Sequence, residues 1–155
     1  MLNPNILKSS FIDTNGYFNK SKYLMTKYKD LDFVQRATIP EKQKMQIPDI
    51  DNPNGFMSHK MSYMNMDGQN YAYPEVVNIN GKLRYIGGKE AMEYAVKNKQ
   101  LIPLGTDNEF AEYFTTTGYK YMFPKEDYEQ SKKEYDYNYQ QKLNRYKYIP
   151  NNIKY

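Results

Sequence analysis

Apolar and polar residues alternate most regularly in the middle of the chain. From residue 57 to 63 every second residue is Met, His or Tyr, and those between are Ser or Lys. A period of two is typical of a strand with one buried face. The Asp67-Gly68 pair then predicts a tight turn. A second strand is expected over residues 71–79, with an edge or bulge at Pro74 because proline cannot donate to a sheet.

Asn80-Gly81 is the strongest hairpin signal in the chain, because both central residues of a type I′ turn need a positive φ. Leu83 and Tyr85 continue the alternation into a third strand. The pattern therefore predicts a three-stranded antiparallel meander with one apolar face, which needs a cover to be stable.

Two short helices are expected to supply this cover. The first, from Glu90 to Lys99, places Ala91, Met92, Ala95 and Val96 on one side.

The second short helix is expected over residues 106–117. Thr106 and Glu109 have the spacing of a capping box, and Gly118 stands where a helix C-cap is expected. Its buried face is expected to hold Phe110, Tyr113 and Phe114.

The two ends of the chain show different patterns. Residues 1–20 lack periodicity and are read as an irregular arm. A short helix follows from Ser21, a candidate N-cap, to Asp32, and a proline-punctuated connector is expected over residues 39–55. From Lys125 to Tyr146 the sequence predicts a long polar helix with one apolar stripe. The stripe contains Tyr128, Tyr135, Tyr139, Leu143 and Tyr146.

Taken together, these patterns predict an α+β fold in three parts. Residues 1–56 form an extended N-terminal arm with a short helix and the connector, and residues 57–121 form an α+β module. Residues 122–155 form a Tyr- and Lys-rich helix and tail.

Composition favours a small packed centre. The hydrophobic fraction of 39% includes 18 tyrosines, and the mean hydropathy is −0.96. We therefore expect the ends to gain order by packing on a partner. Cysteine is absent, which excludes disulfides and thiolate chemistry. No apolar run approaches the length of a membrane span, so no membrane partner is expected.

The basic charge gathers in the last part of the chain. Residues 132–155 hold six basic and two acidic side chains, so they carry the whole net charge of +4. Two readings remain open: a surface for nucleic acid, or a solvated helix face, which is favoured because Glu134 and Asp136 interrupt the run. The candidate nucleic-acid contacts are Lys132, Lys133, Lys142, Arg145 and Lys147.

The aromatic stripe also has two readings. Its tyrosines could stack on bases, or they could pack on a protein, where tyrosine offers a large contact area. Protein packing is favoured, with apolar residues of the N-terminal arm as further anchors. The expected partner-binding residues are Leu7, Phe11, Phe18, Tyr128, Tyr135, Tyr139, Leu143 and Tyr146.

Little of the sequence suggests catalysis. His59 is the single histidine and is expected to be structural, on the same strand face as Met57 and Met61. Gly87-Gly88 precedes a helix but matches no phosphate-loop pattern. The carboxylates fall mostly on expected helix surfaces, as do Glu90, Glu109 and Glu126, and solvated or capping roles are favoured there. The sequence therefore predicts no enzyme, no cofactor and no metal.

Several segments, in order, resemble a module found in virion proteins of tailed bacteriophages. The resemblance covers residues 33–121, with Glu75 standing where threonine is more usual. The segments are Phe33-Val34-Gln35-Arg36, Ile47-Pro48-Asp49-Ile50, Ser58-His59-Lys60-Met61-Ser62, Tyr73-Pro74-Glu75-Val76-Val77, Asn80-Gly81-Lys82-Leu83, Glu90-Ala91-Met92-Glu93-Tyr94-Ala95, Thr106 to Phe114, and Gly118-Tyr119-Lys120.

The resemblance implies a location in the virion, after assembly in the host cytoplasm. Members of that family include internal and ejected proteins, some joined to a lytic transglycosylase. The expected function is that of a non-enzymatic structural protein that docks on portal, tail or internal virion proteins, or on copies of itself. A DNA-associated cargo protein that uses the basic tail is the alternative, and a peptidoglycan-directed accessory factor is the third hypothesis.

Overall fold

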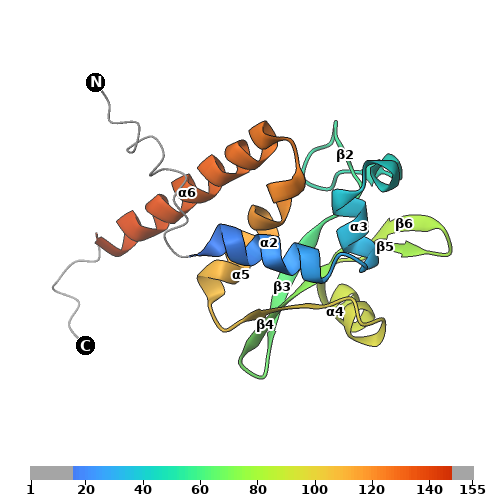
Figure 1. The fold of residues 1–155 in the computed structure, drawn as a ribbon, viewed down its shortest axis with the longest axis horizontal. Helices are drawn as coiled ribbons and strands as arrows, with labels where there is room; N and C mark the ends of the chain where they lie inside the picture. The colour runs from blue at the N-terminus through green and yellow to red at the C-terminus, as the bar shows by residue number, and fades with distance from the viewer. Residues whose placement is uncertain (1–15, 148–155) are drawn as a thin grey trace.

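The computed structural model describes residues 16–147, with side chains up to Arg145, and has an α+β fold (Figure 1). In chain order the elements are α2 (Tyr17–Lys27), α3 (Asp32–Thr38), η1 (Pro40–Lys44), β1 (Ile47–Pro48), β2 (Phe56–Met57), β3 (Met61–Met66), β4 (Gln69–Pro74), β5 (Val76–Ile79), β6 (Lys82–Tyr85), α4 (Gly88–Lys97), β7 (Ile102–Gly105), α5 (Asn108–Thr116), η2 (Gly118–Met122) and α6 (Lys125–Lys147).

Both predicted hairpin turns are confirmed. Strands β3 and β4 pair antiparallel around Asp67-Gly68, and β5 and β6 pair around Asn80-Gly81. Asp67 has φ 53° and Asn80 has φ 54°, and each is followed by a glycine with positive φ. The short polar residue and the glycine thus tolerate the left-handed backbone that these two-residue turns require.

The expected continuous meander is wrong, because the two hairpins belong to different sheets. The three-stranded sheet has the order β3-β4-β7, whereas β5 and β6 form a sheet of two strands. Strand β4 ends at Pro74, and β5, which begins at Val76, pairs with β6 and not with the main sheet. Strand β7, which the sequence did not predict, is the third strand of this sheet. Its own residues Ile102 and Leu104 are buried.

The expected strand from residue 57 to 63 is also divided. Met57 lies in β2, which pairs with β1, and β3 begins only at Met61. The expected connector therefore contributes a short strand and the 3-10 helix η1, neither longer than five residues.

Helices cover both faces of the main sheet. Helix α4 packs on one face, where Met64 and Tyr73 contact Ala91 and Ala95. Val96, which was expected on the apolar side of this helix, is 51% exposed. The opposite face of the sheet carries the main core, formed with α2, α3 and α5. This core includes Met25, Phe33, Val34, Ala72, Ile102, Leu104, Phe110 and Phe114.

Helix α5 buries Phe110, Tyr113 and Phe114 as predicted. Its N-cap, however, is Asp107 and not Thr106: the Asp107 carboxylate accepts hydrogen bonds from the amides of Glu109 and Phe110. Asp and Thr are both good caps, and the chain places the residue nearest the first turn in that role.

Gly118 does not occupy the C-cap of α5 either, because Thr117 does. Gly118 instead opens η2 and lies against Ser21 of α2 and the ring of Tyr113, where a Cβ atom would collide with both. A close approach of two elements, and not a helix end, explains this glycine.

The first helix begins earlier than expected. It starts at Tyr17, with Gly16 as N-cap, so Tyr17–Lys20 are helical and Ser21 is a buried residue within α2. Helix α3 was not predicted at all, yet Phe33 and Val34 are buried in the main core. Residues 17–38 are therefore part of the packed body.

Arg36 joins three parts of the body. Its side chain is only 2% exposed, and its Nε donates to the carbonyl oxygen of Ser58 at 3.0 Å. Its Nη2 donates to the carbonyl oxygen of Val76 at 2.6 Å, and its Nη1 is paired with the Asp32 carboxylate. Burial lowers the pKa of Arg36 to about 10, so the guanidinium remains charged at neutral pH.

We predict that Arg36→Met lowers the free energy of unfolding by about 2–4 kcal/mol, because it leaves two buried carbonyls without donors and breaks the ion pair. Arg84→Met, at an exposed arginine of β6, is the matched control and should change this free energy by no more than about 0.5 kcal/mol. Equilibrium unfolding in urea measures both changes. Equal effects would contradict a stabilising role for the contacts of Arg36 with Asp32, Ser58 and Val76, here called the Arg36 clasp.

Candidate docking groove

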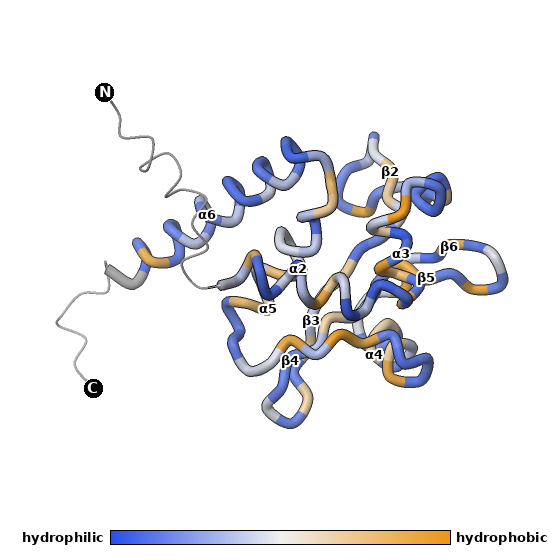
Figure 2. Tube along the Cα trace, in the orientation of Figure 1, coloured by the Kyte–Doolittle hydropathy of each residue, from blue (hydrophilic) through white to orange (hydrophobic). Residues whose placement is uncertain are grey.

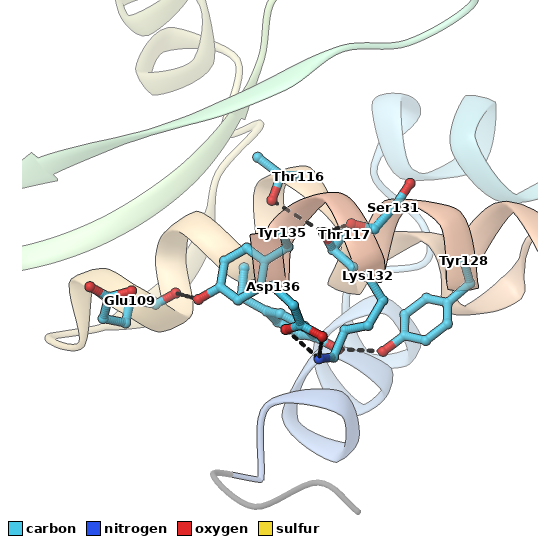
Figure 3. Close-up of polar contacts among 9 residues, drawn as sticks. Glu109, Thr116, Thr117, Tyr128, Ser131, Lys132, Tyr135 and Asp136 are labelled. Carbon is cyan, nitrogen blue, oxygen red and sulfur yellow. Dashed lines mark hydrogen bonds and ion pairs between the residues drawn. The ribbon is translucent and has the colours of Figure 1, made fainter. Parts of the chain in front are cut away.

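Helix α6 lies antiparallel along α5 (Figure 3). Near its start, the hydroxyls of Tyr128 and Tyr113 are 2.5 Å apart. About two turns later the ring of Tyr135 meets that of Tyr113 edge-on, with centroids 5.4 Å apart. The Tyr135 hydroxyl also donates to the carbonyl oxygen of Glu109 at 3.4 Å. These tyrosines anchor the long helix on its own chain.

Polar contacts also hold α6 against α5 and against η2, the 3-10 helix that follows α5. The Nζ of Lys120 donates to the Ser131 hydroxyl at 2.9 Å, and the Thr117 hydroxyl donates to the Ser131 carbonyl oxygen at 3.4 Å. Burial lowers the pKa of Lys120. Further along α6, the Nζ of Lys142 lies 3.1 Å from Oε1 of Glu109.

A groove follows α5 on the side of β3. A cavity of about 400 Å³ lies between α5, α6 and β3, and a second cavity of about 560 Å³ lies between α5, η2 and the segment from β2 to β3. Four residues line both cavities, which therefore adjoin one another, and the two together are here called the α5 groove. The shared residues are Tyr63, Glu112, Thr116 and Lys120.

The α5 groove is rich in tyrosine and carries a negative excess. Among its described lining residues, five carboxylates stand against three lysines, although the whole chain is positive. Lys60 pairs with Asp51 at 2.7 Å, and Lys142 pairs with Glu109. Glu112 is exposed, and within residues 16–147 its carboxylate has no ion pair. An uncompensated carboxylate beside aromatic rings suits a cationic side chain.

His59 lies in the wall of the groove within an aromatic environment. Its ring meets those of Tyr119 and Phe123 edge-on, each at 5.6 Å between centroids, and its Nδ1 lies 3.0 Å from the Ser58 hydroxyl. Burial, assisted by the nearby charges of Lys120 and Arg36, lowers the pKa of His59 to about 4. The imidazole is therefore neutral at physiological pH and packs as an aromatic ring.

The predicted partner-binding residues fall into two groups. Phe18, Tyr128 and Tyr135 pack inside the chain: Phe18 meets Tyr128 edge-on at 5.5 Å, and Tyr135 packs on Tyr113. Tyr139 stacks on Tyr135 but is 37% exposed, and Leu143 is 36% exposed. Leu7, Phe11 and the Tyr146 side chain lie outside the described residues.

The structure disperses the predicted nucleic-acid contacts. Lys132 is bound to both carboxylate oxygens of Asp136, and Lys142 is bound to Glu109. Lys133 and Arg145 are exposed, and the Lys147 side chain lies outside the described residues. Because Lys132 and Lys133 are neighbours on α6, their side chains point about 100° apart around the helix.

Sequence reasoning missed the groove itself. Tyr63 was placed correctly on a strand, and Glu112 was read as a solvated helix residue, but nothing in the sequence brings β3 beside α5 and α6. The one local signal was the Gly118-Tyr119-Lys120 segment, which carries Lys120 into the groove.

No group of three metal-binding side chains occurs within residues 16–147, and no helix in that range is long and apolar enough to cross a membrane. Comparisons with protein-family models, with curated proteins and with solved structures find no match to this chain. The likeness to phage virion proteins therefore remains a prediction from the sequence segments.

We predict that acidification destabilises the protein through His59. The unfolded histidine, with its ordinary pKa of 6.5, takes up a proton before the folded one, whose pKa is about 4. The free energy of unfolding is therefore unaffected by the titration of His59 above about pH 6.5, and it decreases as the pH falls from 6.5 towards 4. From about pH 7 to pH 5, the free energy of unfolding should fall by about 1–2 kcal/mol more in the wild type than in His59→Gln, as measured in urea. Parallel pH profiles would contradict this.

Proposed function

We propose that this chain is a non-enzymatic structural protein of a tailed-phage virion, which docks on portal, tail or internal virion proteins. The observation that carries the docking role is the partial exposure of the α6 stripe. Tyr128 and Tyr135 pack on the body, whereas Tyr139 and Leu143, further along the same helix, are each more than a third exposed.

The distal half of α6 offers this stripe away from the body. Figure 1 shows α6 running past the edge of the packed elements, and Figure 2 shows a hydrophilic helix with a short apolar stretch near its C-terminal end. A helix this polar gains little stability by itself, and most helical stability in proteins comes from packing one face. A partner surface along Tyr139 and Leu143 would supply that packing.

The virion assignment is supported by the ordered segments of the sequence. Three of them meet at one point, because Arg36 binds the main chain at Ser58 and Val76. These contacts of Arg36 hold the fold together. The resemblance therefore supports a shared fold more than a shared chemical site.

Groove chemistry favours binding over catalysis. A general base works best when its pKa lies near the operating pH, and the pKa of His59 lies well below it. The hydroxyl beside it belongs to Ser58, a buried residue whose carbonyl oxygen is held by Arg36.

We predict that Tyr139→Ala combined with Leu143→Ala reduces incorporation of the protein into particles by about tenfold or more, because it removes the exposed part of the stripe. Mass spectrometry of purified particles of the encoding phage measures the copy number. The matched control is Tyr137→Ala, which removes a tyrosine that is 65% exposed on a different side of the same helix.

Both variants should keep the urea midpoint of the wild type, because the changed side chains lie outside the main core. Normal incorporation of the double variant would refute docking through this stripe. Equal loss with Tyr137→Ala would show that any change on α6 is harmful, and would also refute the assignment to Tyr139 and Leu143.

A further inference from the structure

Strand β3 is an edge strand of the three-stranded sheet. Within residues 16–147, the order β3-β4-β7 leaves one side of β3 without a neighbouring strand. Edge strands carry unpaired amides and carbonyls, and proteins usually cover or charge them. What lies along the free side of β3 is therefore informative.

The hairpin geometry shows which backbone groups face that side. In a two-residue hairpin the pair next to the turn, here Met66 and Gln69, is hydrogen-bonded, and hydrogen-bonded pairs then alternate along the ladder. Ser62 and Met64 accordingly bond to β4, whereas Met61 and Tyr63 direct their amides and carbonyls away from it.

Two further observations agree with this parity. Pro74, which has no amide, lies opposite Met61, where the ladder needs no donor. The Glu75 amide donates to the Lys60 carbonyl oxygen at 2.8 Å, as the next bonded pair requires. Among the described residues, the backbone groups of Met61 and Tyr63 make no hydrogen bond to another backbone group outside the ladder.

The α5 groove runs along this free edge. The larger of its two cavities is lined by every residue from His59 to Tyr63 in succession. Successive side chains of a strand point to opposite faces of a sheet, so a cavity that touches all of them lies beside the strand and not on one face. Its opposite wall is formed by Glu112, Thr115 and Thr116 of α5.

We propose that the free edge of β3 accepts an extended segment of a partner polypeptide as an added strand, with a lysine or arginine of that segment facing Glu112. Main-chain hydrogen bonds to Met61 and Tyr63 hold such a segment, and pockets for alternate side chains select it. The inference rests on the proposed docking function and specifies the form of the partner's contact.

Charge identifies the occupant as cationic. Glu112 has no ion pair in the described part of the chain, and the Tyr63 ring beside it offers a cation–π surface. Lys120 does not neutralise Glu112 through an ion pair, because its Nζ is bound to Ser131 on the α6 side of the groove. An acidic segment would instead meet the excess of carboxylates and be repelled.

The first experiment uses a fluorescent library of heptapeptides with lysine or arginine at alternate positions and the intact protein. The tightest binder is then compared with its version N-methylated on alternate amides and with its version carrying glutamate in place of each basic residue. We expect each change to weaken binding about tenfold or more, because the first removes hydrogen bonds and the second reverses charge. Failure of the whole library to bind, or equal binding of the N-methylated peptide, would overturn the proposal.

The second experiment changes the protein. Tyr63→Pro removes an amide that β4 does not use, and Tyr63→Ala is its matched control without the aromatic ring. The proline variant should bind the peptide about tenfold more weakly than the alanine variant. Glu112→Gln should weaken binding about fivefold, whereas Glu90→Gln on α4 should leave it unchanged.

Amide hydrogen exchange keeps the test decisive if the proline variant unfolds. In the wild type the amides of Met61 and Tyr63 should exchange quickly and become protected when the peptide is bound; unchanged exchange on binding would refute strand addition. Peptide binding and particle incorporation are separate readouts. Peptide binding by a protein that is absent from particles would refute the proposed function alone, and incorporation without peptide binding would refute strand addition alone.

Discussion

The buried guanidinium of Arg36, only 2% exposed, needs hydrogen-bond partners, and it finds them in its own helix and in two distant parts of the chain. It binds Asp32 in its own helix, the main chain at Ser58 before β3, and the main chain at Val76 in β5. A buried charge that loses its partners costs more free energy than any one of these contacts contributes. The three segments therefore stay in place together. The clasp thereby aligns the strand that forms the floor of the α5 groove.

The rest of the groove depends on a second constraint, the packing of aromatic rings. Tyr113 of α5 lies against Tyr17 of α2 and Tyr135 of α6, so one residue joins the first helix, the core helix and the long polar helix. These contacts partly bury Tyr128 and Tyr135, the first half of the α6 stripe, and position α6 as one wall of the groove. They end before the stripe does, which leaves Tyr139 and Leu143 partly exposed.

Two surfaces without a packing partner in the described part of the chain therefore lie close together. One is the exposed part of the α6 stripe, and the other is the free edge of β3. Each is a kind of surface that proteins complete by association, one through a helix face and the other through main-chain hydrogen bonds. The same groove contains a histidine that is neutral at physiological pH and packs among aromatic rings. Association with a partner is the use that we propose for these two surfaces.

The sequence by itself determined the features that depend on neighbours along the chain. The turns at Asp67-Gly68 and Asn80-Gly81, the buried face of α5, the burial of Ala91 and Ala95 and the extent of α6 all follow from local conformational preference and periodicity. Only the tertiary structure decided the sheet order, because β7 contains a proline and carries too short a pattern to be recognised alone. It also decided the burial of Arg36 and the inclusion of α2 and α3 in the core. Those outcomes depend on contacts between residues far apart in the chain. The buried area and the hydrogen bonds that such contacts add cannot be read from a local sequence pattern.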